Sequence, residues 1–254
     1  MNYIVMDKSC VSAFSDTINA DNHSHWMLQL FYAFNNDLLI DVNGDEIRFR
    51  CVILNSGVVH NFATRNSLCF TMLIDPSSSL SLELKKKYLQ DKEYHLFDEE
   101  MFLDFNLQFK SLPQMPIDIQ LYENFTSELY HVIGITIQPF IIYDERILDV
   151  IKHLETCDFS ELSIKELAQN LALSPSRLSH LFKEQTGIPL KSFILIHMMQ
   201  RAYTRILQTG DITSAALDAG FDSPSHFAAT SKRLMGMSAT GISKDSVFLK
   251  ASFI

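Results

Sequence analysis

The apolar positions of residues 1–75 fall into short runs rich in Val, Ile, Phe and Tyr. These runs are separated by the turn signals Asn36-Asp37, Asn43-Gly44 and Ser56-Gly57. Short apolar runs with such regular punctuation are typical of β-strands joined by tight turns. The pattern therefore predicts a small sandwich or barrel over residues 1–75.

The pattern becomes helical after Asp75-Pro76, where apolar residues begin to recur every three or four positions. This spacing predicts helices over residues 98–110 and 117–133, and helical structure everywhere beyond Pro139. The second of these helices carries an apolar stripe made of Ile117, Leu121, Phe125, Leu129 and Val132. We interpret residues 76–140 as a helical linker or dimerisation element, with internal packing of the stripe as the alternative.

An internal repeat is the strongest signal in the chain. Ser174-Pro175-Ser176 recurs 49 residues later as Ser223-Pro224-Ser225, and Gly187 recurs as Gly236. Ser as N-cap, Pro at the first helical position and Gly after the end predict a capped helix in each copy. A shorter apolar helix and a tight turn precede each copy, so residues 163–187 and 212–236 are predicted to be helix-turn-helix units.

The second helix of each predicted unit has an apolar and a polar face. The residues expected to point inward are Leu178, Leu181 and Phe182 in the first copy and Phe227, Thr230 and Leu234 in the second. The opposite faces are short, polar and net positive, as expected of helices that contact base edges and phosphates. The candidate DNA-contacting residues are Ser174, Ser176, Arg177, Ser179, His180, Lys183, Ser223, Ser225, His226, Ala229, Lys232 and Arg233.

The two units are joined by residues 190–208, which contain neither Gly nor Pro. The spacing of their apolar residues predicts one helix, which would span ~28 Å at 1.5 Å per residue. Successive major grooves on one face of B-DNA are ~34 Å apart. A connector of this length is therefore suited to holding two recognition helices about one turn of DNA apart.

Residues 143–245 resemble the DNA-binding domain of AraC/XylS-type transcriptional regulators. The residues that carry the resemblance are Leu167-Ala168, Ser174-Pro175-Ser176, Leu181-Phe182-Lys183, Gly187, Phe193, Ala202, Ile212, Ala216, Gly220-Phe221, Ser223, Phe227, Lys232 and Gly236. The chain departs from the family pattern at Leu190, Met198, Ala215, Ser231 and Ala239. Ala215 and Ser231 are smaller than the family's residues, so a thinner core is expected in the second unit. The resemblance implies two helix-turn-helix units that bind double-stranded DNA.

The charge distribution agrees with two parts that have different partners. Residues 1–145 carry 9 basic and 20 acidic side chains, a net charge of −11, whereas residues 163–254 carry 10 and 6, a net charge of +4. The overall charge of −9 hides this difference. A mildly basic C-terminal half remains compatible with DNA binding.

A group of polar side chains is expected inside the N-terminal barrel. Alternation predicts one face made of Trp26, Leu28, Leu30, Tyr32 and Phe34. The same period of two places His23, His25 and Gln29 on the opposite face, and His60 follows the turn at Gly57. The pattern is similar to the cupin β-barrel motif H-x-H-x3-E with P-x-G-x2-H, with Gln29 in the acidic position and Asn55 in the Pro position. AraC-type regulators similarly carry a cupin-like effector domain in this place.

His23, His25, Gln29 and His60 are therefore our candidate effector-binding residues. Lining a pocket for a small effector and being core histidines left from an ancestral site are equally favoured interpretations. A metal site is less favoured because Gln29 replaces the anionic ligand that harder ions prefer. We assign no metal and no cofactor.

The function predicted from the sequence is a cytoplasmic, DNA-binding transcriptional regulator controlled by a small effector. The fold class expected is multidomain α+β: a cupin-like barrel, a helical linker and an all-α tandem helix-turn-helix domain. A metal-dependent, oxygenase-like cupin enzyme is the alternative, but it leaves the repeat unexplained. Common catalytic motifs, a secretory signal and an apolar stretch long enough to cross a membrane are not found, and the four cysteines are expected to be reduced core residues. A homodimer is also expected.

Overall fold

The computed structural model describes residues 2–7, 10–136, 144–186, 188–235, 237–240 and 246–250. The chain forms two compact units. The sheet unit comprises Met1–Pro139, Leu234–Met237 and Lys244–Ile254, and the helical unit comprises Phe140–Arg233 and Ser238–Ser243. Within the described residues, no helix is long and apolar enough to cross a membrane.

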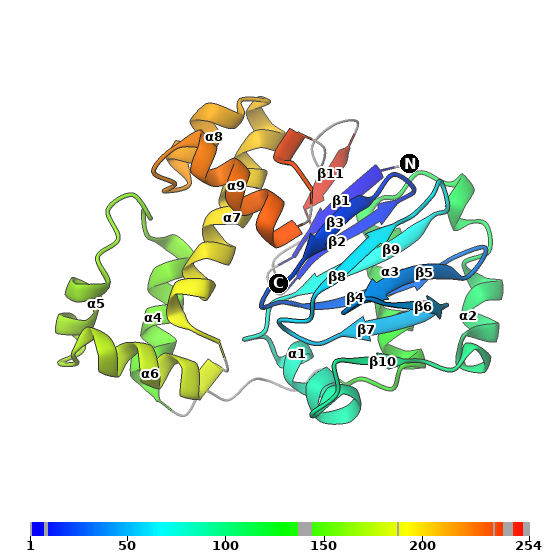
Figure 1. The fold of residues 1–254 in the computed structure, drawn as a ribbon, viewed down its shortest axis with the longest axis horizontal. Helices are drawn as coiled ribbons and strands as arrows, with labels where there is room; N and C mark the ends of the chain where they lie inside the picture. The colour runs from blue at the N-terminus through cyan, green and yellow to red at the C-terminus, as the bar shows by residue number, and fades with distance from the viewer. Residues whose placement is uncertain are drawn as a thin grey trace. The chain divides into compact units, whose positions relative to one another are not determined.

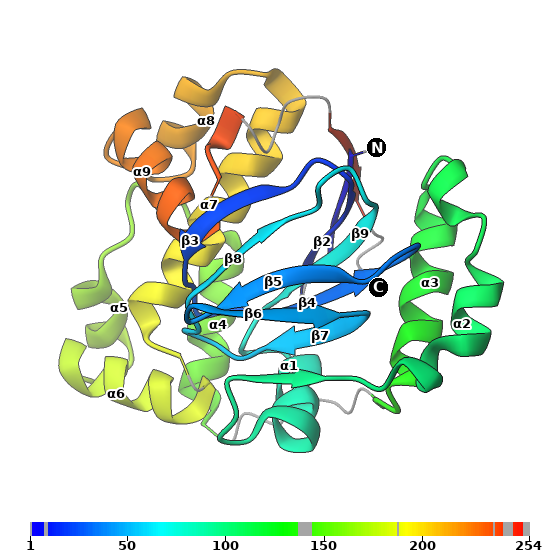
Figure 2. The same cartoon turned by 45° about the vertical axis from the view of Figure 1, so that its right-hand side comes forward.

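Two sheets face each other in the sheet unit (Figure 2). The larger has the strand order β10-β7-β4-β9-β2-β1-β11, and the smaller has the order β3-β8-β5-β6. The strands are β1 (Asn2–Met6), β2 (Cys10–Ser15), β3 (Asn19–His23), β4 (Leu28–Ala33), β5 (Leu38–Val42), β6 (Asp45–Phe49), β7 (Cys51–Leu54), β8 (His60–Ala63), β9 (Cys69–Ile74), β10 (Tyr94–Leu96) and β11 (Val247–Lys250). The predicted β-rich N-terminal part followed by helices is confirmed, but the sheets keep open edges instead of closing into a barrel.

Strand β4 lies at the centre of two cores. Leu30 and Tyr32 pack into the core between the large sheet and the helices. Phe31 and Ala33 pack into the core between the two sheets. The predicted position of Trp26 on the same apolar face is wrong, because Trp26 precedes the strand and 42% of its surface is exposed.

Helices cover the outer face of the large sheet (Figure 1). They are α1 (Ser79–Leu84), a π-helical turn (Lys85–Leu89), 3-10 turns (Glu99–Phe102 and Leu112–Gln114), α2 (Leu103–Gln108) and α3 (Ile119–Val132). The centre of the Phe125 ring on α3 lies 4.8 Å from the centre of the Phe70 ring on β9. The stripe of α3 is internal packing, because Phe125 and Leu129 are fully buried in this core.

The end of the chain contradicts the prediction that everything beyond Pro139 is helical. Strand β11 pairs in parallel with β1, with Val247 opposite Tyr3 and Lys250 opposite Met6. A strand of four residues has too short an apolar pattern to be found by periodicity, and it depends on pairing with the start of the chain. The predicted boundary at Gln138-Pro139 lies outside the described residues.

The helical unit contains α4 (Glu145–Thr156), α5 (Ile164–Asn170), α6 (Pro175–Thr186), α7 (Leu190–Thr209), α8 (Ile212–Asp218) and most of α9 (Pro224–Met235). The predicted N-caps are confirmed: Ser174 Oγ accepts from the Arg177 amide at 3.2 Å, and Ser223 Oγ accepts from the His226 amide at 3.1 Å. The predicted connector helix is also confirmed. Gly187 and Gly236 lie outside the described residues.

The cysteines behave as predicted. All four are free thiols, and Cys10, Cys51 and Cys69 are buried while Cys157 is half-buried. Burial raises the pKa of the Cys51 and Cys69 thiols well above its ordinary value, which keeps both groups protonated.

Candidate functional site

Helix α6 presents its predicted polar face to solvent. Leu178, Leu181 and Phe182 are buried as expected. On the opposite side, the side chains of Ser174, Ser176, Arg177, His180 and Lys183 are exposed, and that of Ser179 is half-buried. Ser179 Oγ donates to the Pro175 carbonyl at 2.9 Å, which occupies its hydroxyl proton within the helix.

Helix α9 repeats this arrangement. Phe227 and Thr230 are buried, whereas Leu234 is only half-buried, so its predicted inward position is met in part. The exposed residues of the opposite face are Ser225, His226, Ala229, Lys232 and Arg233, and the capping Ser223 is half-buried. His226 Nδ1 lies 3.3 Å from a carboxylate oxygen of Asp222.

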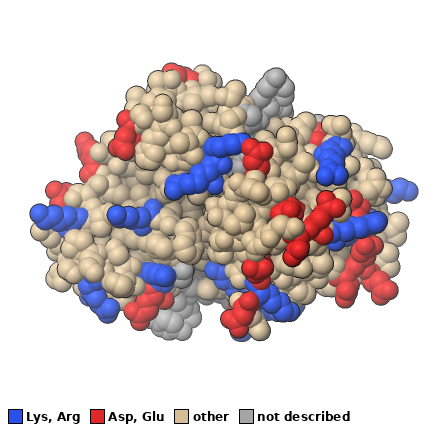
Figure 3. All heavy atoms as spheres, viewed as in Figure 1, with Lys and Arg blue, Asp and Glu red and all other residues tan. Residues whose placement is uncertain are grey.

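The basic side chains on one face of the helical unit are dispersed. On the face seen in Figure 3, Lys and Arg side chains are spread over several parts of this unit instead of forming one continuous patch. This agrees with the modest charge of the C-terminal half. Contacts to phosphates would therefore come from a few individual side chains on each polar face.

Two contacts that the sequence did not reveal involve the end of α4 and the residues that follow it. Arg201 on α7 donates to the carbonyls of Cys157 and Leu154 at the end of α4, and its guanidinium lies 4.2 Å from the centre of the Phe159 ring. Gly220, in the turn of the second unit, is so close to this segment that an added Cβ would lie 2.6 Å from Phe159 Cβ. The end of α4 and the residues that follow it therefore contact both α7 and the turn of the second unit.

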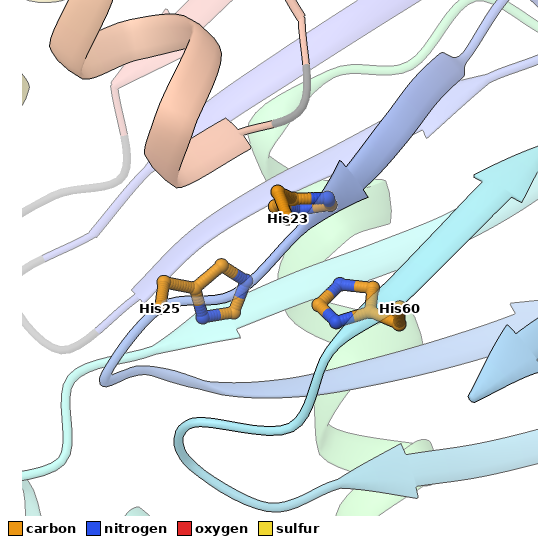
Figure 4. Close-up of side chains that lie close together, drawn as sticks. All are labelled: His23, His25 and His60. Atoms are coloured by element: carbon orange, nitrogen blue, oxygen red, sulfur yellow. The ribbon is translucent and has the colours of Figure 1, made fainter. Parts of the chain in front are cut away.

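The predicted polar group in the sheet unit forms one buried cluster, which we call the histidine cluster: His23, His25, Gln29 and His60. His23 at the end of β3 pairs with His60 at the start of β8 in the small sheet. Gln29 lies on β4 of the large sheet, and its Oε1 is 3.1 Å from His25 Nε2 and 2.9 Å from His60 Nε2. The cluster thus lies between the two sheets, and Figure 4 shows its three rings around a common space.

One member of this network was missed from the sequence. The amide nitrogen of Gln29 donates to Thr71 Oγ1 on β9 at 3.0 Å. Thr71 is the single polar side chain in the strand sequence CFTMLI, and this was the available signal. Asn55, the residue in the Pro position of the cupin pattern, instead donates to the Lys92 carbonyl.

Burial makes the imidazoles of His25 and His60 poor bases, because it lowers their pKa values. The pKa of His25 is lowered to about 4, first by loss of hydration and then by the neighbouring His23. The pKa of His60 is lowered to about 3 by loss of hydration and by His23 and His25. Both rings are therefore neutral at pH 7.

Comparison with known proteins identifies a helix-turn-helix domain in the helical unit. A family model described as a helix-turn-helix domain matches residues 167–244. The arabinose operon regulatory protein of Salmonella typhimurium is 30% identical over 122 residues, which cover 47% of this chain and 43% of that protein. The protein of the same name from Escherichia coli is 35% identical over 80 residues, or 31% of this chain and 27% of that protein. The matches thus span less than half the length of these relatives.

The fold extends the likeness over nearly the whole chain. A crystal structure of an apo point variant of ToxT from Vibrio cholerae has a TM-score of 0.55 at 14% identity and covers 91% of this chain and 96% of that one. A second structure, of ToxT from Vibrio cholerae O395, has a TM-score of 0.51 at 14% identity, with coverage of 94% and 100%. At these identities the likeness establishes a shared fold.

Proposed function

We propose, from the premise that this chain belongs to the AraC/XylS family of transcriptional regulators, that it is a sequence-specific DNA-binding regulator. In this proposal the helical unit reads double-stranded DNA, and the sheet unit senses a small effector. The named relatives are arabinose operon regulatory proteins, so regulation of an operon is the role they support. We propose no catalytic activity, because an enzyme would leave the repeated units without a use.

The observation that carries the proposal is the pair of capped helices with solvent-facing polar sides. Helices α6 and α9 begin at the equivalent residues Pro175 and Pro224, and each is capped by a Ser side chain. Helix α7, with 20 residues, is ~30 Å long and joins the two units. This length supports recognition of two half-sites in successive major grooves, which lie ~34 Å apart.

The exposed residues of the two helices fall into those suited to contacting base edges and those suited to contacting phosphates. Arg177 and His180 lie in the first half of α6, the part of a recognition helix that contacts base edges. The basic residues further along each helix are suited to binding phosphates, a Lys as a point charge and an Arg through two N–H groups of its guanidinium. They are Lys183 on α6 and Lys232 and Arg233 on α9. The capping Ser174 and Ser223 would contact the backbone at the helix start.

Selection of DNA from a randomised pool with the full-length protein tests this function. We expect enrichment of a motif with two half-sites whose centres are about one helical turn apart. A variant with both Arg177→Ala and His180→Ala should keep its fold by circular dichroism and lose the enrichment of one half-site. A control variant, Lys165→Ala, changes an exposed Lys of α5 outside the candidate set and should enrich the parental motif. Equal affinity of the parent protein for all sequences would refute specific DNA recognition.

Effector sensing is assigned to the histidine cluster because its polar atoms are gathered between two sheets and away from bulk solvent. We expect His25→Ala or His60→Ala to abolish the effector response while DNA binding by the helical unit persists. Reporter expression and DNA binding measured on the same variants separate these two outcomes. Loss of DNA binding in both variants would contradict the division of roles.

A homodimer and a cytoplasmic location remain predictions of this proposal. The packed stripe of α3 is not the expected dimer surface, since its central residues Phe125 and Leu129 are buried within the chain. Sedimentation equilibrium of the full-length protein, with and without DNA, measures its oligomeric state. A monomer under both conditions would rule out the homodimer.

A further inference from the structure

Helix α2 exposes two leucines to solvent. Leu103 is 62% exposed and Leu107 is 71% exposed, the largest exposed fractions among the large apolar side chains that the structure describes. Residues four apart lie on the same face of a helix, so these two side chains form one apolar patch. The other face is held in the core by the buried Phe105 and Phe109. The patch therefore cannot turn inward without breaking this core.

An exposed charge lies at each end of the patch. Glu100 precedes Leu103 by three residues, in the 3-10 turn that leads into α2, and Lys110 follows Leu107 by three residues. Both charged side chains are exposed. A spacing of three residues keeps side chains on neighbouring positions of one helix face. Glu100, Leu103, Leu107 and Lys110 thus form one outward row, which we call the α2 stripe.

The α2 stripe is complementary to itself when a second copy runs in the opposite direction. Its pattern is centred on Phe105, with a leucine two residues away and a charge five residues away on either side. A twofold dimer pairs each residue with the residue equally far on the other side of the centre. Leu103 then faces Leu107 of the second copy, and Glu100 faces its Lys110.

We propose that the α2 stripe docks in antiparallel orientation against the α2 stripe of a second copy of this chain. Four leucines form the apolar centre of this contact, and a Glu–Lys pair closes each end. Residues 1–145 carry 9 basic and 20 acidic side chains, a net charge of −11, so two copies of this half carry like charge. The opposite charges within the stripe select this surface and this orientation against the general repulsion.

This surface differs from the one that the sequence suggested. The stripe of α3 is internal packing, because Phe125 and Leu129 are buried. Helix α2 lies beside α3 at the margin of the sheet unit in both views of the fold (Figures 1 and 2). The inference thus rests on the homodimer of the proposed function and names its surface.

The contact is small, because α2 has six residues. Stable protein interfaces bury ~1,200–2,000 Å² in total, and smaller ones belong to weak, reversible complexes. We therefore expect a dimer that forms and dissociates as the protein concentration is changed.

Sedimentation velocity of the full-length protein over a range of concentrations tests the dimer. We expect the parent to shift reversibly from monomer to dimer. Leu103→Gln combined with Leu107→Gln should weaken association about tenfold or more, because it removes the apolar centre of the contact. Leu82→Gln is the matched control, since Leu82 is an exposed leucine of α1 in the same unit, and this variant should associate like the parent.

Charge reversal tests the antiparallel pairing itself. Glu100→Lys places like charges opposite each other at both ends of the contact, and so does Lys110→Glu. Each variant alone should therefore associate about fivefold more weakly than the parent. An equimolar mixture of the two variants has opposite charges at both ends again, and it should form a heterodimer as strong as the parent dimer. The double variant with both reversals should also dimerise like the parent.

Three results would overturn the inference: a parent protein that stays monomeric, a dimer that persists in the double leucine variant, or a mixture of the two charge variants that associates no better than either alone. A monomeric parent would also remove the homodimer from the proposed function, whereas the other two results would remove only this surface. Selection of DNA by the same samples is measured separately. Loss of sequence preference in the parent would refute the regulator and leave the α2 contact standing.

Discussion

The hydroxyl of Tyr203 on α7 lies 2.6 Å from the hydroxyl of Ser231 on α9. Both side chains are buried, and the centre of the Tyr203 ring lies 5.6 Å from the centre of the Phe227 ring. The sequence led us to expect a thin core at Ser231, where related regulators have a larger residue. The structure shows that Tyr203 compensates, because the small Ser leaves room for an aromatic ring from the connector and also binds its hydroxyl.

Ser231→Ala should therefore destabilise the protein by ~1–3 kcal/mol, because it leaves the buried phenol of Tyr203 without this partner. The double variant Ser231→Ala with Tyr203→Phe should recover part of the loss, since no buried hydroxyl then remains at this contact. Urea denaturation followed by circular dichroism measures both. Additive losses in the double variant would show that the two hydroxyls do not depend on each other.

Gly220→Ala should destabilise the second helix-turn-helix unit. The residue has a φ of +91°, and an added Cβ would lie 2.6 Å from Phe159 Cβ. Gly210 is a matched control because its φ is +71° but nothing lies within 4 Å of its added Cβ. Gly210→Ala is expected to cost ~1 kcal/mol from the backbone alone, and Gly220→Ala clearly more. Equal midpoints of urea denaturation for the two variants would contradict the close contact.

The stability of the protein should fall on acidification between about pH 6.5 and pH 4. The pKa of His25 is lowered to about 4 and that of His60 to about 3, so the unfolded chain binds protons in this range that the folded chain does not. The unfolding free energy then rises with pH, by at most ~1.4 kcal/mol per pH unit for each group, and levels off above the unfolded value of ~6.5.

Denaturation midpoints at pH 7 and pH 5 check this prediction. His60→Gln should reduce the pH dependence, because one of the two depressed groups is gone. His131→Gln changes an exposed His and should leave the dependence as in the parent. A parent protein that is equally stable at both pH values would show that these rings are not buried in their neutral form.

Local rules explain which parts of the fold were predictable. Helices α6 and α9 follow from a capping Ser, a Pro at the first position and apolar residues on one side, all within twelve residues. Strands β10 and β11 have three and four residues and exist by pairing with β7 and β1. Their sequences are too short for a periodic signal, so no local rule identifies them.

The histidine cluster shows the same division. The period of two placed His23 and Gln29 on one face of a single alternating stretch, whereas His23 ends β3 of the small sheet and Gln29 lies on β4 of the large sheet, so it is the packing of the two sheets that brings the cluster together. Thr71 joins Gln29 from a strand 42 residues away, which requires knowledge of the sheet order. Arg201 was missed for a similar reason, because its carbonyl partners lie 44 and 47 residues earlier in the chain.

On DNA, substitutions in α6 and α9 should differ in kind. Arg177→Ala or His180→Ala is expected to relax base preference in one half-site at a cost of ~1–3 kcal/mol, since such side chains read base edges. Lys232→Ala should weaken binding to all sequences alike and lower the salt slope by ~1, as expected for one phosphate contact. Titrations at several salt concentrations measure both. A Lys232 variant with the parental salt slope would remove its phosphate assignment.

The spacing of the two units along α7 gives a further prediction. Phe193 and Ile194 belong to the core of the first unit, whereas Tyr203 and Ile206 are buried further along the helix. Two Ala residues inserted between Met198 and Met199 would turn the second unit by ~200° and move it by ~3 Å. Ala favours the helix, so α7 should continue through the insertion. The polar face of α9 would then point away from the second half-site.

The insertion also displaces Arg201 from the carbonyls of Cys157 and Leu154, so a change of phase must be distinguished from loss of this contact. Arg201→Met removes the contact and leaves the length of α7 unchanged. If α7 sets the spacing, nuclease protection of the second half-site should vanish in the insertion variant and persist in Arg201→Met, with the first half-site protected in both. Loss of the second half-site in both variants would mean that Arg201 holds the two units in register. Protection of both half-sites at parental affinity in the insertion variant would exclude a rigid connector, because a turn of ~200° cannot leave the same face of α9 on the DNA.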